Sequence, residues 1–267
     1  MNSLKLAKKI RINCIKMVNL GKSSHIGSAL SIVDILSVLY GGILNFDPKK
    51  PLNEERDRFI LSKGHAGVAV YATLAEVGFF STEVLKTHCQ NGSKLSGHVS
   101  HKDVPGVEFS TGSLGHGLPV ACGIAMAGKI AESSFNVYVL LGDGELDEGS
   151  NWEAMMFASH HKLNNLTVII DRNNLQSITT TDKTLNLEPL EAKLMSFGMD
   201  VSVVDGHDHI ELYESLKTKS EKPKLIIANT TKGKGVSFME NSVDWHYKTP
   251  LGVYFDRAIQ EINESSL

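Results

Sequence analysis

Short apolar segments recur along the chain, and they limit the folds open to it more than any other feature. Residues 137–141 (VYVLL) and 166–170 (LTVII) consist almost wholly of apolar and β-branched residues. Such runs are typical of strands in a parallel sheet whose two faces are both buried. Residues 58–61, 200–204 and 224–228 are predicted as three further strands. Helical patterns separate these segments, so we predict an α/β fold with a mostly parallel sheet flanked by helices.

Helical spacing of apolar residues fills the intervals around these strands. Residues 6–17 and 29–39 show it before the first strand, which predicts two amphipathic helices packed on a core. Further helices are predicted at about residues 66–77, 82–88, 116–131, 152–159 and 208–217. Residues 91–114 are rich in Gly, Ser and His and are predicted as a loop. A loop of this length is unusual in a compact domain and often carries function.

Composition narrows the classes of function. The formal net charge is −3 and no long basic run is present, so we expect no binding to nucleic acid or to a membrane. Cys14, Cys89 and Cys122 are odd in number and lack the spacing of metal ligands, which is typical of free thiols in a reducing compartment. We find no secretory signal and no window with the ~18 apolar residues of a membrane span. We therefore expect a cytoplasmic protein with a single domain over residues 1–267.

An acidic cluster follows the predicted strand at residues 137–141. The sequence LLGDGELDEG places Asp143, Glu145, Asp147 and Glu148 within six positions, where their charges repel one another. Such a cluster requires a cation, a proton or a basic partner. A helix is predicted to begin near Glu148, and its N-terminal dipole would favour an anion in the same region.

Asp143 and Asn173 are predicted to lie at the carboxyl ends of neighbouring strands. Thirty residues separate them, about the length of one strand–helix–strand unit. Ligands of open α/β sheets bind outside the carboxyl ends of the strands. A carboxylate, an amide oxygen and a backbone carbonyl near Leu175 suit Mg²⁺, which usually also takes phosphate oxygens and water. Gly142 and Gly144 leave room for a diphosphate to approach the backbone.

The combination of GDG at 142–144 with NN at 173–174 resembles the thiamine diphosphate fingerprint, and the surrounding sequence is similar to the N-terminal half of a transketolase. The matching motifs follow the family's order along nearly the whole chain: SSHIGSAL (23–30), LSKGHA (61–66), LSGHVS (95–100), STGSLGHG (110–117), GDGELDEGSNWEA (142–154), DRNNLQ (171–176), DGHD (205–208) and TKGKG (231–235). The resemblance implies the thiamine diphosphate-binding fold of the family's diphosphate-binding (PP) domain.

The resemblance also implies roles around the cofactor, position by position. Asp143, Asn173 and the carbonyl of Leu175 would hold Mg²⁺, or Ca²⁺ or Mn²⁺ in its place, on the diphosphate of thiamine diphosphate. Leu114 would pack on the thiazolium ring. The remaining cofactor-binding positions, which line the diphosphate pocket, would be His65, Gly112, Gly142 and Gly144.

The resemblance further implies a substrate site built from histidines. His25, His98 and His246 would surround the sugar, and Glu148 would lie near a subunit interface and take part in acid–base communication between sites. Histidine suits the removal and return of a hydroxyl proton because its unperturbed pKa lies near 6.5. At His246 the sequence reads DWHYK, whereas family members more often place a glycine where this chain has Tyr247.

Full-length transketolases continue into domains that have no counterpart in this sequence. Those domains bind the aminopyrimidine ring, supply a glutamate that activates it, and carry the arginines that bind the substrate phosphate. The resemblance therefore implies the N-terminal subunit of a split transketolase, active with a C-terminal subunit in an α2β2 assembly. That enzyme would transfer a two-carbon ketol unit from a ketose, such as a ketose phosphate, to an aldose. Glu145, Asp147 and Glu148 would meet their partners in the second subunit.

Two alternatives remain open from the sequence. One is a related thiamine enzyme, either similar to deoxyxylulose-phosphate synthase or a specialised sugar-modifying split transketolase. The other is a non-catalytic subunit that keeps the cofactor fold. A nucleotide-binding module is disfavoured because the chain has no G-x-x-x-x-G-K-[ST] loop. The donor and acceptor sugars stay open as well.

Overall fold

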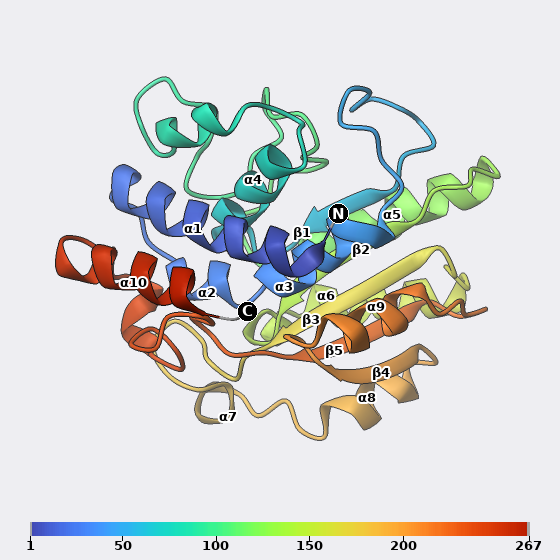
Figure 1. The fold of residues 1–267 in the computed structure, drawn as a ribbon. Coiled ribbons are helices and arrows are strands. Elements are labelled where there is room, and N and C mark those ends of the chain that lie inside the picture. The colour runs from blue at the N-terminus through green and yellow to red at the C-terminus, as the bar shows by residue number, and fades with distance from the viewer. Residues whose placement is uncertain (1, 266–267) are drawn as a thin grey trace.

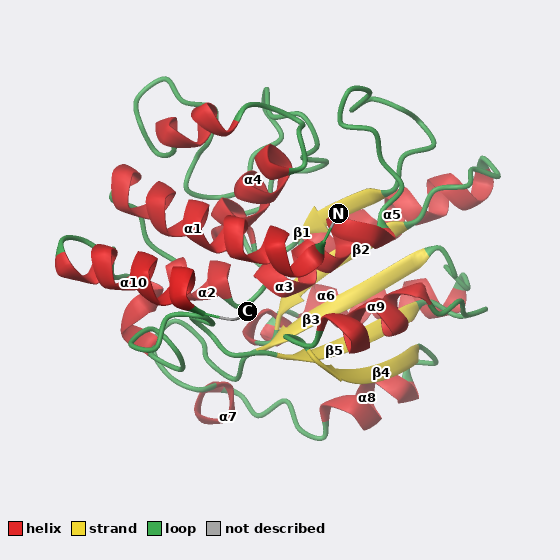
Figure 2. Ribbon diagram, viewed as in Figure 1, coloured by secondary structure: helices red, strands yellow, loops and turns green. Residues whose placement is uncertain are grey.

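The computed structural model describes residues 2–265, and within them one five-stranded sheet forms the centre of the protein (Figures 1 and 2). Its strands are β1 (Arg58–Leu61), β2 (Val137–Gly142), β3 (Leu166–Arg172), β4 (Asp200–Asp205) and β5 (Lys224–Asn229). All neighbouring strands are parallel, in the order β1-β2-β3-β5-β4. The sequence prediction of five strands and of an α/β fold is therefore confirmed, with strand ends that differ by two residues at most.

Helices cover both faces of the sheet and make two separate apolar cores. One face carries α1 (Ser3–Gly21), α2 (Ile26–Leu30), α3 (Val33–Val38), α4 (Gly67–Glu76), α9 (His209–Lys217) and α10 (Val253–Glu264). The other face carries α5 (Gly117–Ile130), α6 (Gly149–His160) and α8 (Leu190–Ser196). Because side chains alternate along each strand, neighbouring residues such as Val139 and Leu140 belong to opposite cores.

The order of the strands explains why α9 lies apart from α5, α6 and α8. From β1 to β3 the chain moves in one direction across the sheet, and the helices that lead directly into β2 and β3, α5 and α6, pack on one face. It then passes to the edge strand β4 and returns through α9 to β5. A right-handed connection that reverses direction must cross on the opposite face, and α9 packs there.

The segment predicted as an amphipathic helix at 29–39 differs from expectation. It is a broken helix, in which α2 and α3 are followed by a π-helical turn at Leu39–Ile43, and every residue from 26 to 40 is buried. By length and composition Ile26–Ile43 is one stretch apolar enough to cross a membrane, so the prediction that no such window exists was wrong. In this structure 83% of the stretch is buried inside the protein, as in the core helix of a globular domain.

The remaining α-helices agree with the sequence except at four places. Residues Thr82–Thr87 form a 3-10 helix in place of the predicted α-helix, and α7 (Thr181–Thr184), α8 and α10 were not predicted. Residues 88–116 contain no helix or strand, as predicted for the long Gly-, Ser- and His-rich loop. This loop brings His98, Gly112 and Leu114 back to the carboxyl ends of the strands.

Candidate active site

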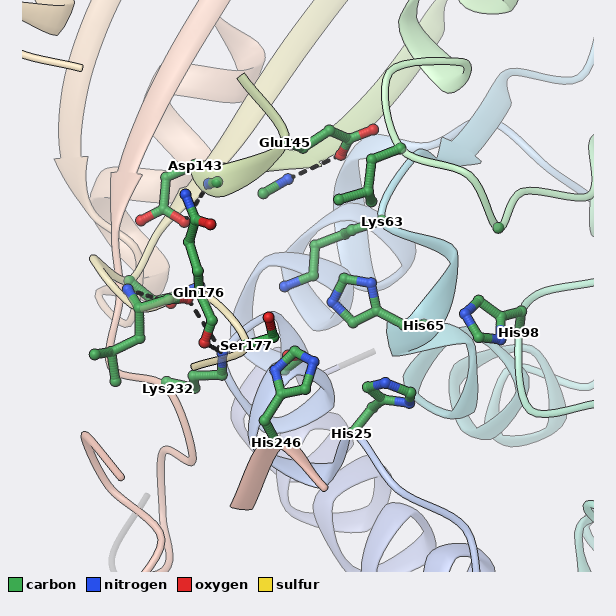
Figure 3. A pocket seen from close by; sticks show the side chains of 17 residues that line it. His25, Lys63, His65, His98, Asp143, Glu145, Gln176, Ser177, Lys232 and His246 are labelled. Atoms are coloured by element: carbon green, nitrogen blue, oxygen red, sulfur yellow. Dashed lines mark hydrogen bonds between the residues drawn. The ribbon is translucent and has the colours of Figure 1, made fainter. Parts of the chain in front are cut away.

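A cavity of about 270 Å³ lies at the carboxyl ends of the central strands (Figure 3). Gly142 of β2 pairs with Asp171 of β3, so the two strands end side by side and release Asp143 and Asn173 at the same edge. This is the position at which parallel α/β sheets bind ligands. The cavity brings together eleven of the twelve predicted site residues: His25, His65, His98, Gly112, Leu114, Gly142, Asp143, Gly144, Asn173, Leu175 and His246.

Asp143 is a buried carboxylate to which no basic side chain among residues 2–265 is bonded. Its two oxygens accept hydrogen bonds from the backbone amides of Gly144 (2.8 Å) and Asn174 (2.5 Å). Asn174 reaches this position with a left-handed backbone, φ 61°. Burial, together with the nearby carboxylate of Asp171, raises the pKa of Asp143 to about 6. A carboxylate in this state gains stability from a bound cation.

The other two predicted metal ligands lie beside Asp143 on the loop after β3. The side-chain oxygen of Asn173 accepts a hydrogen bond from the amide of Leu175 (3.1 Å), and its Nδ2 donates to Asp171 (3.0 Å). The carbonyl oxygen of Leu175 accepts a hydrogen bond from the ammonium of Lys232 (3.1 Å).

These three groups are hard oxygen donors and suit Mg²⁺ better than zinc. Within residues 2–265 no group of three or more His, Cys, Asp or Glu side chains is arranged to hold a metal ion. A cation at Asp143 would therefore draw its remaining ligands from carbonyls, amides, water and ligand phosphate. The donor set fits the predicted cation.

Lys63 and Lys232 supply positive charge to the same end of the cavity, and the sequence interpretation missed both. The ammonium of Lys63 lies 2.5 Å from Oδ2 of Asp171, and both side chains are fully buried. Burial alone would raise the pKa of Asp171, but the charge and hydrogen bond of Lys63, together with hydrogen bonds from the hydroxyls of Thr230 and Ser31, hold that pKa below its usual value. Burial and the charge of Lys63 lower the pKa of Lys232 to about 8. Both lysines belong to motifs identified in the sequence, LSKGHA and TKGKG, each of which lies at the end of a predicted strand. A basic residue in such a motif was a signal from which both could have been predicted.

A chain of partly buried hydrogen bonds holds the segment that carries Lys232. His207 Nδ1 lies 2.7 Å from Oδ2 of Asp34, and its Nε2 accepts a hydrogen bond from the amide of Thr231 (2.8 Å). Arg11 lies 2.5 Å from the same carboxylate. Lys232 directly follows Thr231, so these contacts fix the backbone from which its side chain enters the cavity.

Four histidines line the side of the cavity that lies opposite Asp143, as Figure 3 shows. The ring of His25 lies 4.9 Å from that of His246, 5.2 Å from His65 and 5.7 Å from His98. The amide of His25 donates to the carbonyl of His246 (2.8 Å), although the two residues are far apart in sequence. His25 adopts a left-handed backbone, φ 70°, which is rare for a residue with a side chain and is often found at functional sites.

The surroundings of these histidines favour the neutral ring. Burial, aided by the charges of His98 and the two lysines, lowers the pKa of His25 to about 4. Burial and Lys232 lower the pKa of His246 to about 3, and burial and Lys63 lower that of His65 well below its usual value. At neutral pH these rings are uncharged and can accept a proton. Nδ1 of His246 is buried without a hydrogen-bond partner among residues 2–265.

Glu145 has partners within the chain, which corrects the prediction that a second subunit provides them. Its carboxylate accepts hydrogen bonds from the hydroxyl of Ser62 and from the amides of Gly115 (2.9 Å) and Gly142 (3.1 Å). Burial still raises the pKa of Glu145 above its usual value. The carboxylate thus holds the loop at Gly115 against the end of β2.

Asp147 and Glu148 behave differently from Glu145. Oδ2 of Asp147 accepts a hydrogen bond from Gln176 (2.8 Å), while its other oxygen is buried without a partner among residues 2–265. Glu148 is exposed and lies outside the cavity, so its role at a subunit interface stays a prediction. The N-terminus of α6 does not line this cavity either. Its Ser150 lines a separate groove between α5 and α6, so the predicted dipole contribution is not supported.

The glycines of the cavity keep it open for a ligand. A Cβ on Gly144 would lie 2.7 Å from Cγ of Gln176, and one on Gly142 would meet Cδ of Lys63 at 3.7 Å. A side chain at position 144 would therefore displace Gln176 and fill part of the space beside Asp143. Together with two lysines and the buried carboxylate of Asp143, this space fits a diphosphate with its metal ion.

Comparisons with known proteins agree with this geometry. Residues 3–260 match the family described as transketolase, thiamine diphosphate binding domain. The chain is 46% identical to a subunit of apulose-4-phosphate transketolase from Actinobacillus succinogenes, over 97% of this chain and 95% of that protein. It is 43% identical to the subunit of the same name from Phocaeicola vulgatus, over 97% and 92% of the two chains.

The fold also matches solved structures. A crystal structure of transketolase from Campylobacter jejuni superposes with a TM-score of 0.93 at 35% identity. That match covers 98% of this chain but 43% of the transketolase chain, so the chain spans less than half the length of that enzyme. The chain therefore belongs to the transketolase family and carries that family's thiamine diphosphate-binding domain.

Proposed function

We propose that this chain binds thiamine diphosphate together with a divalent cation, as one component of a two-component transketolase. The enzyme transfers a two-carbon ketol unit from a ketose to an aldose acceptor. One observation carries the proposal, namely that a single cavity joins an end suited to diphosphate and metal with a cluster of neutral histidines. The family match supports the cofactor, and the geometry of Asp143 supports the cation.

At the diphosphate end of the cavity, charged and polar groups of this chain bind the diphosphate and the cation. Lys63 and Lys232 offset the negative charge of the diphosphate. Asp143, Asn173 and the carbonyl of Leu175 would hold Mg²⁺, together with phosphate oxygens and water. Thiamine diphosphate, when bound, supplies the nucleophile that attacks the ketose carbonyl.

At the histidine end, the task is to position hydroxyl groups and move protons. The ring of His25 or His246 accepts the proton of a donor hydroxyl while the adjacent carbon–carbon bond breaks. The same ring later returns a proton to the product. His98 lies on the exposed loop and contacts the sugar from the outer side of the cluster.

The second component is a separate subunit with the pyrimidine-binding part of the enzyme. This chain covers more than nine tenths of the two apulose-4-phosphate transketolase subunits that it matches, but less than half of a full-length transketolase. The cavity's two carboxylates, Asp143 and Glu145, are engaged by backbone amides and by Ser62, which leaves the activating glutamate to the partner. A symmetric α2β2 complex follows from the two-fold symmetry common to oligomeric enzymes.

We further propose that the substrate is a sugar phosphate and that the protein is cytoplasmic. The names of the two relatives support a sugar phosphate as substrate. All three cysteines are free thiols, which supports a reducing, cytoplasmic environment.

The proposal is tested by preparing the chain alone and together with its partner subunit. Calorimetry should show thiamine diphosphate binding to the complex that requires Mg²⁺ and disappears in Asp143→Ala. Ketol transfer from a ketose phosphate to an aldose by the complex should likewise require Mg²⁺ and disappear in Asp143→Ala. Cofactor binding that ignores both Mg²⁺ and Asp143 would refute the site.

A further inference from the structure

Tyr247 stands beside the histidine cluster, outside the cavity that the histidines line. It follows the 3-10 turn Val243–His246, and its amide donates to the carbonyl of Asp244 (3.2 Å). Its ring lies 4.7 Å from the ring of His246, edge to face, and 6.1 Å from the ring of His25. Tyr247 does not line the cavity itself, but its ring lies against two rings that do, and we call this position the rim of the cavity.

Tyr247 contributes little to the core of the protein. Its side chain is 60% exposed, and its hydroxyl makes no hydrogen bond to any residue from 2 to 265. Tyr254 offers a useful contrast, because it is 51% exposed but packs on Trp245 and Phe238 at 5.4 and 5.5 Å. Tyr254 is held by a structural aromatic cluster, whereas the ring contacts of Tyr247 among residues 2–265 are with His246 and His25 of the site.

In the proposed reaction, the two transferred carbons would lie beside the histidines inside the cavity, and the remaining carbons of the ketose would extend past this rim toward solvent. A tyrosine at the rim presents an aromatic face to C–H groups and a free hydroxyl to sugar hydroxyls. It also occupies volume that a long ketose needs, while a short ketose ends before reaching it.

We propose that Tyr247 is a specificity-determining residue, which contacts the sugar beyond the transferred two-carbon unit and selects short ketoses over long ones. This inference rests on the proposed ketol transfer. We attribute the selection to the bulk of the Tyr247 ring at the rim and not to its hydroxyl. The ring is positioned by its contacts with His246 and His25 and not by a hydrogen bond of the hydroxyl.

The test compares donors of different length in the assembled two-subunit enzyme with one aldose acceptor. The donors are hydroxypyruvate, which carries the same ketol unit on a carboxylate, a five-carbon ketose phosphate and a seven-carbon ketose phosphate. In Tyr247→Gly, the ratio of kcat/KM for the seven-carbon donor to that for the five-carbon donor should rise about tenfold, the scale of a changed pocket contact. Tyr247→Phe keeps the bulk and should keep the wild-type ratio, as should the control Tyr254→Ala.

The outcomes separate this inference from the function on which it rests. An unchanged ratio in Tyr247→Gly overturns the inference, whether the individual rates stay equal or fall together for all donors. A raised ratio in Tyr247→Phe overturns the assignment to bulk. If the wild-type complex turns over no donor, hydroxypyruvate included, the proposed function fails and the inference fails with it.

Discussion

The ammonium of Lys232 lies 3.1 Å from the carbonyl oxygen of Leu175 and 3.0 Å from that of Gln176. The first of these carbonyls is a predicted ligand of the metal ion. The ammonium of Lys232 therefore holds the loop after β3, beside the carboxylate of Asp143, which accepts its hydrogen bonds from the backbone amides of Gly144 and Asn174. The same ammonium is available to a diphosphate, so loop and cofactor binding are linked through one side chain.

Replacing Lys232 should weaken cofactor binding for this reason. In Lys232→Met we expect the dissociation constant of thiamine diphosphate to rise at least tenfold at saturating Mg²⁺, because a buried charge-assisted contact is lost. Calorimetry on the assembled complex measures it. Lys234→Met, in the same TKGKG segment, is the matched control and should bind as wild type does. Equal affinities in all three proteins would remove Lys232 from the diphosphate site.

Asp143 should matter for the cofactor and little for the fold. Within residues 2–265 its carboxylate accepts hydrogen bonds from backbone amides alone, and the side chain belongs to neither apolar core. In Asp143→Ala or Asn173→Ala we expect loss of Mg²⁺-dependent cofactor retention with a melting temperature within a few degrees of wild type. Asp182→Ala, an exposed acid on the neighbouring segment, is the control. Undiminished retention in both variants would contradict the metal site.

How far the sequence predicts this site depends on whether a residue's partner is near in the motif or distant in the chain. Asp143 and Asn173 were predictable because strand ends and spacing place them together. The partner of Glu145 was not, because Ser62 and Gly115 reach it from separate loops. The broken helix at 26–43 was not predicted either, because its burial depends on segments distant in the chain. An amphipathic helix on a sheet has one exposed face, but here other helices pack on that face and bury it.

His98 should affect sugar cleavage much more than cofactor binding. It lines the cavity 5.7 Å from the ring of His25, on the opposite side from Asp143. In His98→Ala we expect kcat/KM for a ketose donor to fall tenfold or more, a loss of about 1.4 kcal/mol of transition-state stabilisation. Cofactor affinity should stay within twofold. His101→Ala, in the same exposed loop, tests whether any histidine there has this effect, and equal kinetics for the His98 variant and wild type would reject the role.

The neutral histidines should make the fold sensitive to acid. The folded pKa of His25 is lowered to about 4, while the unfolded chain has its usual value near 6.5. Below pH 6.5 the unfolded state takes up protons that the folded state does not, so stability is full above 6.5 and declines as the pH falls toward 4. In His25→Asn the free energy of unfolding should decline less over this interval. Denaturant titrations at several pH values measure it, with the exposed His160→Asn as control. Parallel declines in His25→Asn and wild type would contradict the burial of a neutral ring.

The groove between α5 and α6 is the face at which we expect the partner subunit to bind. This chain supplies the diphosphate and metal end of the cavity and the histidine cluster, but its cavity carboxylates are committed to the backbone and to Ser62. Exposed apolar residues of α6, Met156 and Phe157, lie near the groove that Ser150 lines, as expected for a face that another subunit covers.

We therefore expect the isolated chain to show no ketol transfer at saturating thiamine diphosphate and Mg²⁺, and activity to appear when the partner subunit is added. Charged substitutions on this face, such as Phe157→Glu, should reduce co-elution of the two proteins or of the assembled α2β2 complex without lowering the melting temperature of the isolated chain. Glu153→Gln, on the same groove, keeps the size of the side chain and should preserve assembly. Full turnover by the isolated chain would falsify the two-component interpretation, because the missing activating glutamate would then have to come from this sequence.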